Sequence, residues 1–210
     1  QAIIIAVILF SLSVFISLNF SYFFLFFILS LFLTTQIYTF KLKHIAFADV
    51  LTISVNFVLR TVAGVFIVSN TPKTIGMSYW LILCPFFLAL FLASSKRQSE
   101  VKFLKNRTKK HRRVLAQYTK EVTFGLMIIS TTLLIAAYSI YVITGPYKRL
   151  IFTLPFVLYI VFKLFYFADK GMQVARKLDL VFKNKDIVLS LIVILIITFF
   201  AIYAKGIFFN

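Results

Sequence analysis

The stretch Trp80–Lys120, WLILCPFFLALFLASSKRQSEVKFLKNRTKKHRRVLAQYTK, joins a long apolar run to a short segment that holds ten lysines and arginines. Within this stretch Glu100 is the single acidic residue. An apolar run followed at once by dense positive charge is typical of a membrane helix that ends at the cytoplasmic surface. The same arrangement suits a membrane protein that binds a phosphorylated ligand, so both uses of the charge stay open.

The composition of the whole chain favours the same class. Hydrophobic residues make up 61% of the 210 residues, and the mean hydropathy is +0.99. The net charge of +17 lies between apolar runs that are too long for a soluble core, so we expect no nucleic-acid partner. The single cysteine, Cys84, excludes an internal disulfide, and His44 and His111 are not spaced as zinc ligands.

We therefore predict an all-α membrane protein in which residues 1–210 form a single transmembrane domain, a multispanning helical bundle. The apolar runs are continuous rather than alternating, which excludes a membrane β-barrel. Each run is close to the ~20 residues that cross a bilayer. Seven spans are expected, at Ala2–Leu18, Tyr22–Phe40, Ala48–Val68, Tyr79–Ser94, Val122–Ile143, Leu150–Phe167 and Ile187–Ala204.

The distribution of lysine and arginine predicts the orientation. The loops on the face shared with the N-terminus hold 17 of these residues and the opposite loops hold 4. The N-terminal face is therefore expected in the cytoplasm and the C-terminus outside. The chain begins without Met and enters a span at once, so we expect a fragment whose N-terminal part lies upstream of Gln1.

Polar residues inside the third predicted span recur on one helical face. Asp49, Asn56 and Arg60 are spaced by seven and four residues, which places them on one side at about 100° per residue. A charge at mid-bilayer is costly, so such residues face the bundle interior or a cavity. Arg60 then either binds an anionic ligand or is satisfied by backbone carbonyls of a neighbouring helix.

A second polar face is predicted in the sixth span, where Tyr159, Lys163 and Tyr166 follow the i, i+4, i+7 pattern. Two cationic faces directed into a bundle indicate an anionic ligand in a cavity that opens to the cytoplasm. Interior tyrosines are also common without any ligand role.

The basic segment begins with Lys96 and Arg97, which we place at the exit of the fourth span. Lys96 and Glu100 are separated by four residues and are expected to pair. Arg97 is then expected to be available for a ligand, whereas most of the lysines in Lys102–Lys110 serve as solvated or headgroup-facing charges.

These residues belong to ordered motifs that resemble the UbiA superfamily of intramembrane prenyltransferases, and within it the decaprenyl-phosphate phosphoribosyltransferase branch. Phe57–Gly64 is similar to the branch pattern F-V-L-R-x-x-A-G, and Trp80–Glu100 to W-L-x-x-C-x-F-F-L-A-L-x-L-A-x-x-K-R-x-x-E. The remaining blocks are Tyr38 with Leu42–Lys43 and Asp49–Val50, His111–Tyr118 (HRRVLAQY) and Thr153–Tyr166 (TLPFVLYIVFKLFY).

The resemblance implies a bundle of nine helices, with two spans and the first acidic motif, N-D-x-x-D, upstream of Gln1. No metal ligand is expected in this chain, and Mg²⁺ would be held by that motif, so the fragment alone is expected to be inactive. Two departures weaken the likeness, because Lys163 stands where the branch has Arg, and Met172–Val174 replaces the usual P-E after Gly171.

The resemblance implies transfer of 5-phosphoribose from phosphoribosyl pyrophosphate to a polyprenyl phosphate at the cytoplasmic side of a bacterial plasma membrane. The chain has no D-x-x-x-D motif, and cations in its place suit direct phosphate binding. Phosphate contacts are expected from Lys43, Arg60, Lys96 and Arg97, with Asp49 and Glu100 as catalytic residues that position these cations or a ribose hydroxyl. Second-tier substrate-binding residues are Arg113, Tyr118, Tyr159 and Lys163.

Two other functions stay open from the sequence. A UbiA-type prenyltransferase for an aromatic acceptor shares the fold but should contain the second acidic motif. A non-enzymatic lipid-phosphate transporter would also use a cationic cavity, although its spans should show an internal repeat. The oligomeric state is not predicted.

Overall fold

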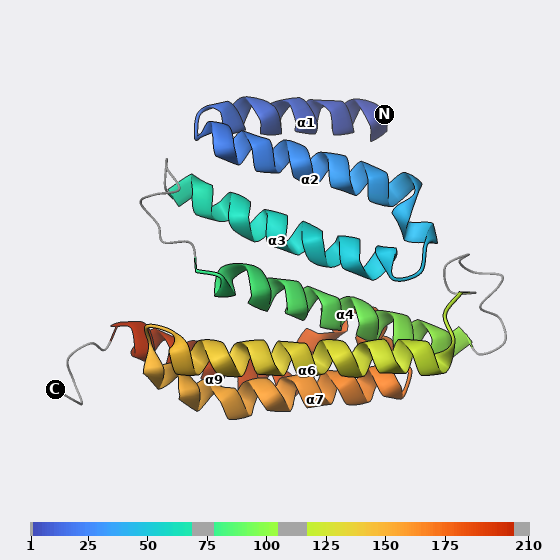
Figure 1. Ribbon diagram of the computed structural model, residues 1–210, viewed down its shortest axis with the longest axis vertical. Coiled ribbons are helices and arrows are strands. Elements are labelled where there is room, and N and C mark those ends of the chain that lie inside the picture. The colour runs from blue at the N-terminus through green and yellow to red at the C-terminus, as the bar shows by residue number, and fades with distance from the viewer. Residues whose placement is uncertain (1, 69–77, 105–116, 204–210) are drawn as a thin grey trace. The chain divides into compact units, whose positions relative to one another are not determined.

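The computed structural model describes residues 2–68, 78–104 and 117–203, and within these ranges the chain is helical without a β-strand (Figure 1). The prediction of an all-α multispanning bundle is confirmed. In chain order the elements are α1 (Ala2–Leu18), α2 (Tyr22–Phe40), η1 (Leu42–His44), α3 (Ala48–Val68), α4 (Trp80–Leu104), α6 (Lys120–Thr144), η4 (Lys148–Thr153), α7 (Leu154–Asp169), α8 (Gln173–Arg176), η5 (Leu178–Lys183) and α9 (Lys185–Tyr203).

Six of the helices in the described ranges are long and apolar enough to cross a membrane, so this is an integral membrane protein. Large apolar side chains on them stay exposed, such as Leu195 at 68% and Phe199 at 59%. Water would not tolerate so much apolar surface, whereas lipid does. The helix α1 corresponds to the first of the seven predicted spans. Its 17 residues reach only about 25 Å, which is shorter than the ~30 Å of hydrocarbon, so α1 is not one of these six helices.

One predicted boundary is wrong. The fourth span was expected to end at Ser94, but α4 continues to Leu104 as a helix of 25 residues. The segment after Ser94 contains no Gly or Pro and consists largely of good helix formers, so nothing in it stops the helix. Lys96, Arg97 and Glu100 therefore lie within α4 rather than at its exit.

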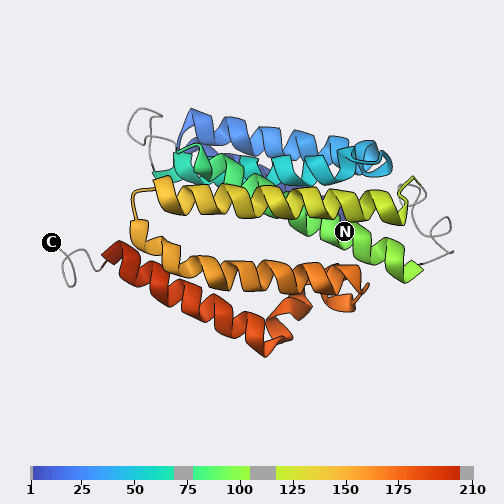
Figure 2. The same cartoon turned by 60° about the horizontal axis from the view of Figure 1, so that its bottom comes forward.

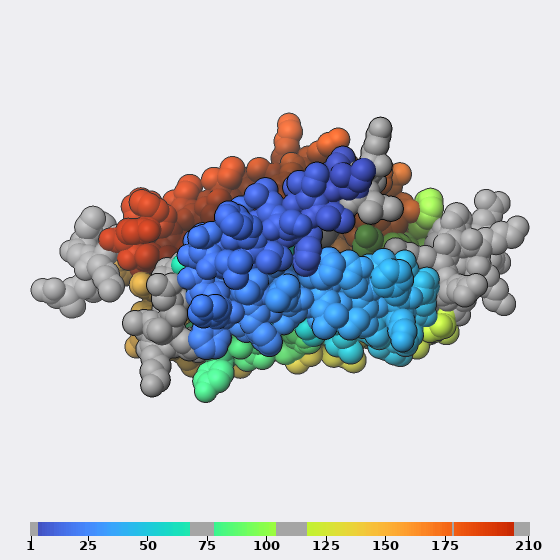
Figure 3. Space-filling view, turned by 90° about the horizontal axis from the view of Figure 1, so that it is seen from above, coloured from blue at the N-terminus to red at the C-terminus, as the bar shows by residue number. Residues whose placement is uncertain are grey.

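The chain divides into two compact units, Gln1–Ala89 and Leu90–Asn210. In the first unit α2 packs against both α1 and α3 (Figure 1), and Figure 3 looks onto the outer surface of α1 and α2. Ser21 caps α2 by accepting a hydrogen bond from the Phe24 amide, and its hydroxyl donates to the Phe66 carbonyl of α3. The ring of Phe66 stacks on Phe23 and Phe27 at 5.3 Å in each case, which joins α2 to α3.

In the second unit α7 packs against α6 and α9, and η4 makes the turn between α6 and α7 (Figure 2). Val142, Leu150 and Ala201 form a buried apolar cluster at the η4 end of these helices. The hydroxyls of Tyr138 and Thr153 hydrogen-bond at 2.6 Å beside this cluster. Tyr138 therefore has a packing role at the end of α6.

Two hydrogen bonds join α4 to α6 within the second unit. The hydroxyls of Ser94 and Ser130 lie 2.7 Å apart, and the Thr123 hydroxyl donates to the Gln98 side-chain oxygen. Small hydroxyl-bearing residues allow membrane helices to approach closely, and their hydrogen bonds add stability. This polar seam aligns the basic end of α4 with the first turn of α6.

The turn that follows α7 lies against α4. Gly171 has a φ of 67°, which side chains other than glycine rarely adopt, and a Cβ atom there would lie 3.2 Å from the Cβ of Lys102. The Ser99 hydroxyl donates to the Met172 carbonyl at 3.0 Å. Glycine at position 171 therefore permits both the backbone turn and the close approach to α4.

Candidate functional site

The first group of site residues lies in the second half of α4. Arg97 is 3% exposed and forms an ion pair with Glu100, which is 17% exposed, whereas Lys96 is exposed. The predicted pair between Lys96 and Glu100 is therefore wrong. A buried guanidinium needs a carboxylate far more than a solvated ammonium does, so Glu100 goes to Arg97.

A second ion pair on α4 was missed by the sequence analysis. The Lys102 ammonium donates to the carboxylate of Asp169, the last residue of α7, at 2.5 Å. The two residues are 67 positions apart, so local spacing gave no sign of the contact. The available signal was composition, because an excess of 23 lysines and arginines over six acidic residues favours an ion pair for a carboxylate such as Asp169.

The predicted polar face of the sixth span is found on α7, but its charge is balanced. Lys163 forms an ion pair with Asp186 in the first turn of α9 and donates a hydrogen bond of 3.1 Å to the Tyr159 hydroxyl. Tyr159 and Tyr166 are both about half exposed. The expected second cationic face is thus a Lys163–Asp186–Tyr159 network, which weakens the case for Lys163 as a phosphate contact.

Three further predicted residues belong to the first unit. Asp49, in the first turn of α3, is fully buried at 0% exposure, and Lys43 in η1 is partly buried. Arg60 is exposed, and its guanidinium carbon lies 5.8 Å from the centre of the Phe57 ring. Within the described ranges Arg60 contacts this ring, and not the backbone carbonyls of a neighbouring helix that would satisfy a purely structural arginine. Asn56, expected on the same face, accepts a hydrogen bond from Thr34 of α2.

Of the two predicted substrate-binding residues in the basic segment, Arg113 and Tyr118, the structure describes only Tyr118. Tyr118 lies just before α6 and is buried. Arg113, together with most of the lysines of the segment, lies outside the described residues. The structure therefore brings Arg97 together with Glu100, and Lys163 with Tyr159, while Lys43, Asp49 and Arg60 lie in the other unit.

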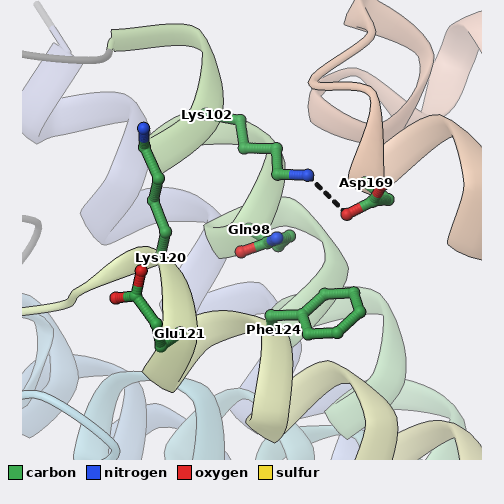
Figure 4. A pocket seen from close by; sticks show the side chains of 6 residues that line it. All are labelled: Gln98, Lys102, Lys120, Glu121, Phe124 and Asp169. Carbon is green, nitrogen blue, oxygen red and sulfur yellow. Dashed lines mark hydrogen bonds and ion pairs between the residues drawn. The ribbon is translucent and has the colours of Figure 1, made fainter.

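An open cavity of ≈ 260 Å³ lies where α4 and α7 end and α6 begins (Figure 4). It was not predicted, because its residues come from three helices and most of them belong to no motif of the resemblance. Gln98 and Lys102 contribute from α4 and Asp169 from α7, with Lys120, Glu121 and Phe124 from the first turns of α6.

The chemistry of the described acidic residues does not fit a magnesium site. No three His, Cys, Asp or Glu side chains gather in the described ranges. Glu100, Asp169 and Asp186 each pair with a lysine or arginine, which leaves these carboxylates unsuited to share a divalent cation. None of the residues that the structure describes is therefore assigned to hold Mg²⁺.

Comparison with known proteins agrees with the motif-based resemblance. The chain is 28% identical over 115 residues to a decaprenyl-phosphate phosphoribosyltransferase of Mycolicibacterium smegmatis, a match that covers 54% of the chain and 35% of that relative. It is 29% identical over 104 residues to a protein of the same name from Corynebacterium glutamicum, covering 50% of the chain and 30% of the relative.

The chain thus matches only about a third of the length of these two relatives. No protein-family model matches the chain. The predicted resemblance is confirmed: over about half of its length, this integral membrane protein is similar to the decaprenyl-phosphate phosphoribosyltransferases.

Proposed function

We propose that the whole protein transfers 5-phosphoribose from phosphoribosyl pyrophosphate to a polyprenyl phosphate at the cytoplasmic side of the membrane. The observation that carries this proposal is the similarity of half the chain to two proteins named for phosphoribosyl transfer to decaprenyl phosphate. The apolar surface of the helices supports it, because a long isoprenoid tail needs a path within the bilayer.

The cations offer sites of two kinds for a substrate with several phosphate groups. Arg60 and Lys96 are exposed, and no carboxylate pairs with either in the described ranges, so their charge is available to phosphate oxygens. Arg97 is held by Glu100 in an ion pair, which fixes the position of its guanidinium group. Asp49 and Glu100 act in this proposal by positioning cations, and Lys43 adds a further partly buried ammonium.

The reaction is a substitution at the anomeric carbon of the ribose. A phosphate oxygen of the lipid forms the new bond to this carbon while the bond to pyrophosphate breaks, and pyrophosphate leaves with both electrons. The attacking oxygen is already anionic near neutral pH, so no strong general base is required. Cations preorganised around the departing pyrophosphate stabilise the charge that develops there. Magnesium dependence is proposed for the whole protein only.

The test uses membranes that contain the full-length protein. Labelled phosphoribosyl pyrophosphate and a polyprenyl phosphate should yield label that extracts into organic solvent. Lys148→Gln, which changes an exposed lysine in η4, should retain this activity. Transfer of a prenyl group to an aromatic acid would instead assign the protein to the prenyltransferase alternative.

A further inference from the structure

The cavity at the ends of α4, α6 and α7 is lined by a buried amide whose nitrogen has no hydrogen-bond partner among the described residues. Gln98 is 1% exposed and lines this cavity (Figure 4). Its side-chain oxygen accepts from Thr123, whereas its Nε2 atom has no hydrogen-bond partner within the described ranges. A buried N–H group without an acceptor lowers the stability of the fold. A ligand with acceptor oxygens in this cavity would remove that cost.

The charges around this cavity are balanced, unlike those of the chain as a whole. Lys102 is paired with Asp169, while Lys120 and Glu121 are both exposed at the start of α6. Two ammonium groups therefore face two carboxylates in a protein of net charge +17. A purely anionic ligand meets repulsion from these carboxylates and finds unopposed cations elsewhere. A ligand that has both a negative and a positive group matches the lining better.

The position of the cavity along the helices indicates a ligand at headgroup depth. Its residues come from the last turns of α4 and α7 and the first turns of α6. All three belong to spans long enough to cross the bilayer, so their ends lie at the interface between hydrocarbon and water. Phe124 lies one turn inside α6 and adds an apolar wall on the membrane side.

We propose that this cavity binds the headgroup of a membrane phospholipid with a primary amine beside its phosphate, of the phosphatidylethanolamine type. Gln98 Nε2 and the Lys120 ammonium donate to phosphate oxygens. The Glu121 carboxylate accepts from the lipid ammonium, and Phe124 contacts the glycerol end. Choline headgroups have no N–H donor for Glu121, and glycerol headgroups have no cation. The binding site does not depend on the proposed transfer reaction.

The test compares lipid binding by the full-length protein after removal of native lipid. The protein is titrated with phosphatidylethanolamine, phosphatidylcholine or phosphatidylglycerol of identical acyl chains, and bound lipid is counted by native mass spectrometry. Phosphatidylethanolamine should bind about tenfold more tightly than phosphatidylcholine, the gain expected from one charge-assisted hydrogen bond. Glu121→Gln should abolish the preference for phosphatidylethanolamine over phosphatidylcholine. Lys120→Gln should weaken the binding of both of these lipids.

Two exposed residues provide matched controls. Lys148→Gln and Asp179→Asn remove the same charges outside the cavity and should leave the preference intact. Gln98→Leu should weaken binding, and because Gln98 is buried, the exposed variants decide the test if this one does not fold. Equal binding of the three lipids would overturn the proposal, as would displacement of the bound lipid by inorganic phosphate or phosphoribosyl pyrophosphate. Loss of the preference in both control variants would overturn it as well.

Discussion

Charged side chains on the second half of α4 should differ in how much they contribute to the stability of the fold. Arg97 is buried and forms an ion pair with Glu100. We expect Glu100→Gln to lower the free energy of unfolding by about 3 kcal/mol, because it removes the carboxylate from a buried ion pair. Lys96→Gln is the control, and it should change stability by less than about 0.5 kcal/mol since Lys96 is exposed. Denaturant unfolding in detergent measures both, and equal losses would contradict the assignment.

A double variant separates stability from substrate binding at the same pair. Arg97→Leu with Glu100→Leu removes both buried charges, so it should recover most of the stability lost in Glu100→Gln. If Arg97 also binds phosphate, phosphoribosyl transfer should be lost in this double variant even though the protein is stable. Transfer at the unmodified rate would show that the pair only supports the fold.

Arg60 offers a cleaner test of phosphate binding, because it is exposed and pairs with no carboxylate in the described ranges. Arg60→Lys keeps the charge but loses the planar fork that grips two phosphate oxygens. Activity per folded molecule should fall at least about tenfold, while abundance and thermal stability stay close to those of the unmodified protein. A variant with normal activity but low abundance would instead indicate a structural arginine.

We expect Ser94 and Ser130, which form part of the polar seam between α4 and α6, to be only weakly coupled in their effects on stability. One of the Ser94 and Ser130 hydroxyls donates to the other, and the accepting hydroxyl donates to a carbonyl of its own helix. Each serine also has such a carbonyl within reach, so loss of one hydroxyl leaves the other with a hydrogen-bond acceptor. Ser94→Ala and Ser130→Ala should therefore show a coupling free energy of only about 0.6 kcal/mol in a double-mutant cycle. Thr132→Ala, at an exposed position of α6, should show no coupling to Ser94→Ala. A coupling of several kcal/mol would mean that the seam dominates the packing of α4.

The extents of the helices could largely be read from the sequence, since runs of about 20 apolar residues have few other stable conformations in lipid. The end of α4 could not, because a polar stretch that continues a helix looks the same as a polar loop that begins after one. Ion-pair partners were also beyond local reasoning. Asp169 meets Lys102 and Asp186 meets Lys163 only after helices distant in the sequence have packed together.

The geometry around the predicted site residues could be read from the sequence only in part. Spacing placed Lys163 and Tyr159 on one helical face, where they hydrogen-bond, but it paired Glu100 with Lys96 rather than with Arg97. It could not show that Lys163 is balanced by Asp186, or that the buried Gln98 amide nitrogen would have no hydrogen-bond partner in the described ranges. Periodicity reports which residues share a face of one helix, whereas burial depends on what packs against that face.

For the molecule as a whole, the charge bias predicts one orientation in the membrane. Lys177, between α8 and η5, should be cytoplasmic, and Lys148, in η4, should be external. Starting from a Cys84→Ser background, Lys148→Cys should react with a membrane-impermeant maleimide in intact cells. Lys177→Cys should react only after the cells are opened. The reverse pattern would place the basic loops outside and would remove the cytoplasmic substrate from the proposed function.

The contacts of α4 also set an order of events during synthesis. The partner of Gln98, Thr123, lies 25 residues later in the chain. The partners of Lys102 and Ser99, Asp169 and Met172, follow only after 67 and 73 residues. At ~5–20 residues per second, the first delay is about 1–5 s and the second about 3–13 s. The newly made α4 therefore joins α6 while the ribosome is still translating α7. For several seconds its basic end has no Asp169 and no Gly171 turn beside it, and that interval is when an insertion factor or chaperone would find it most accessible.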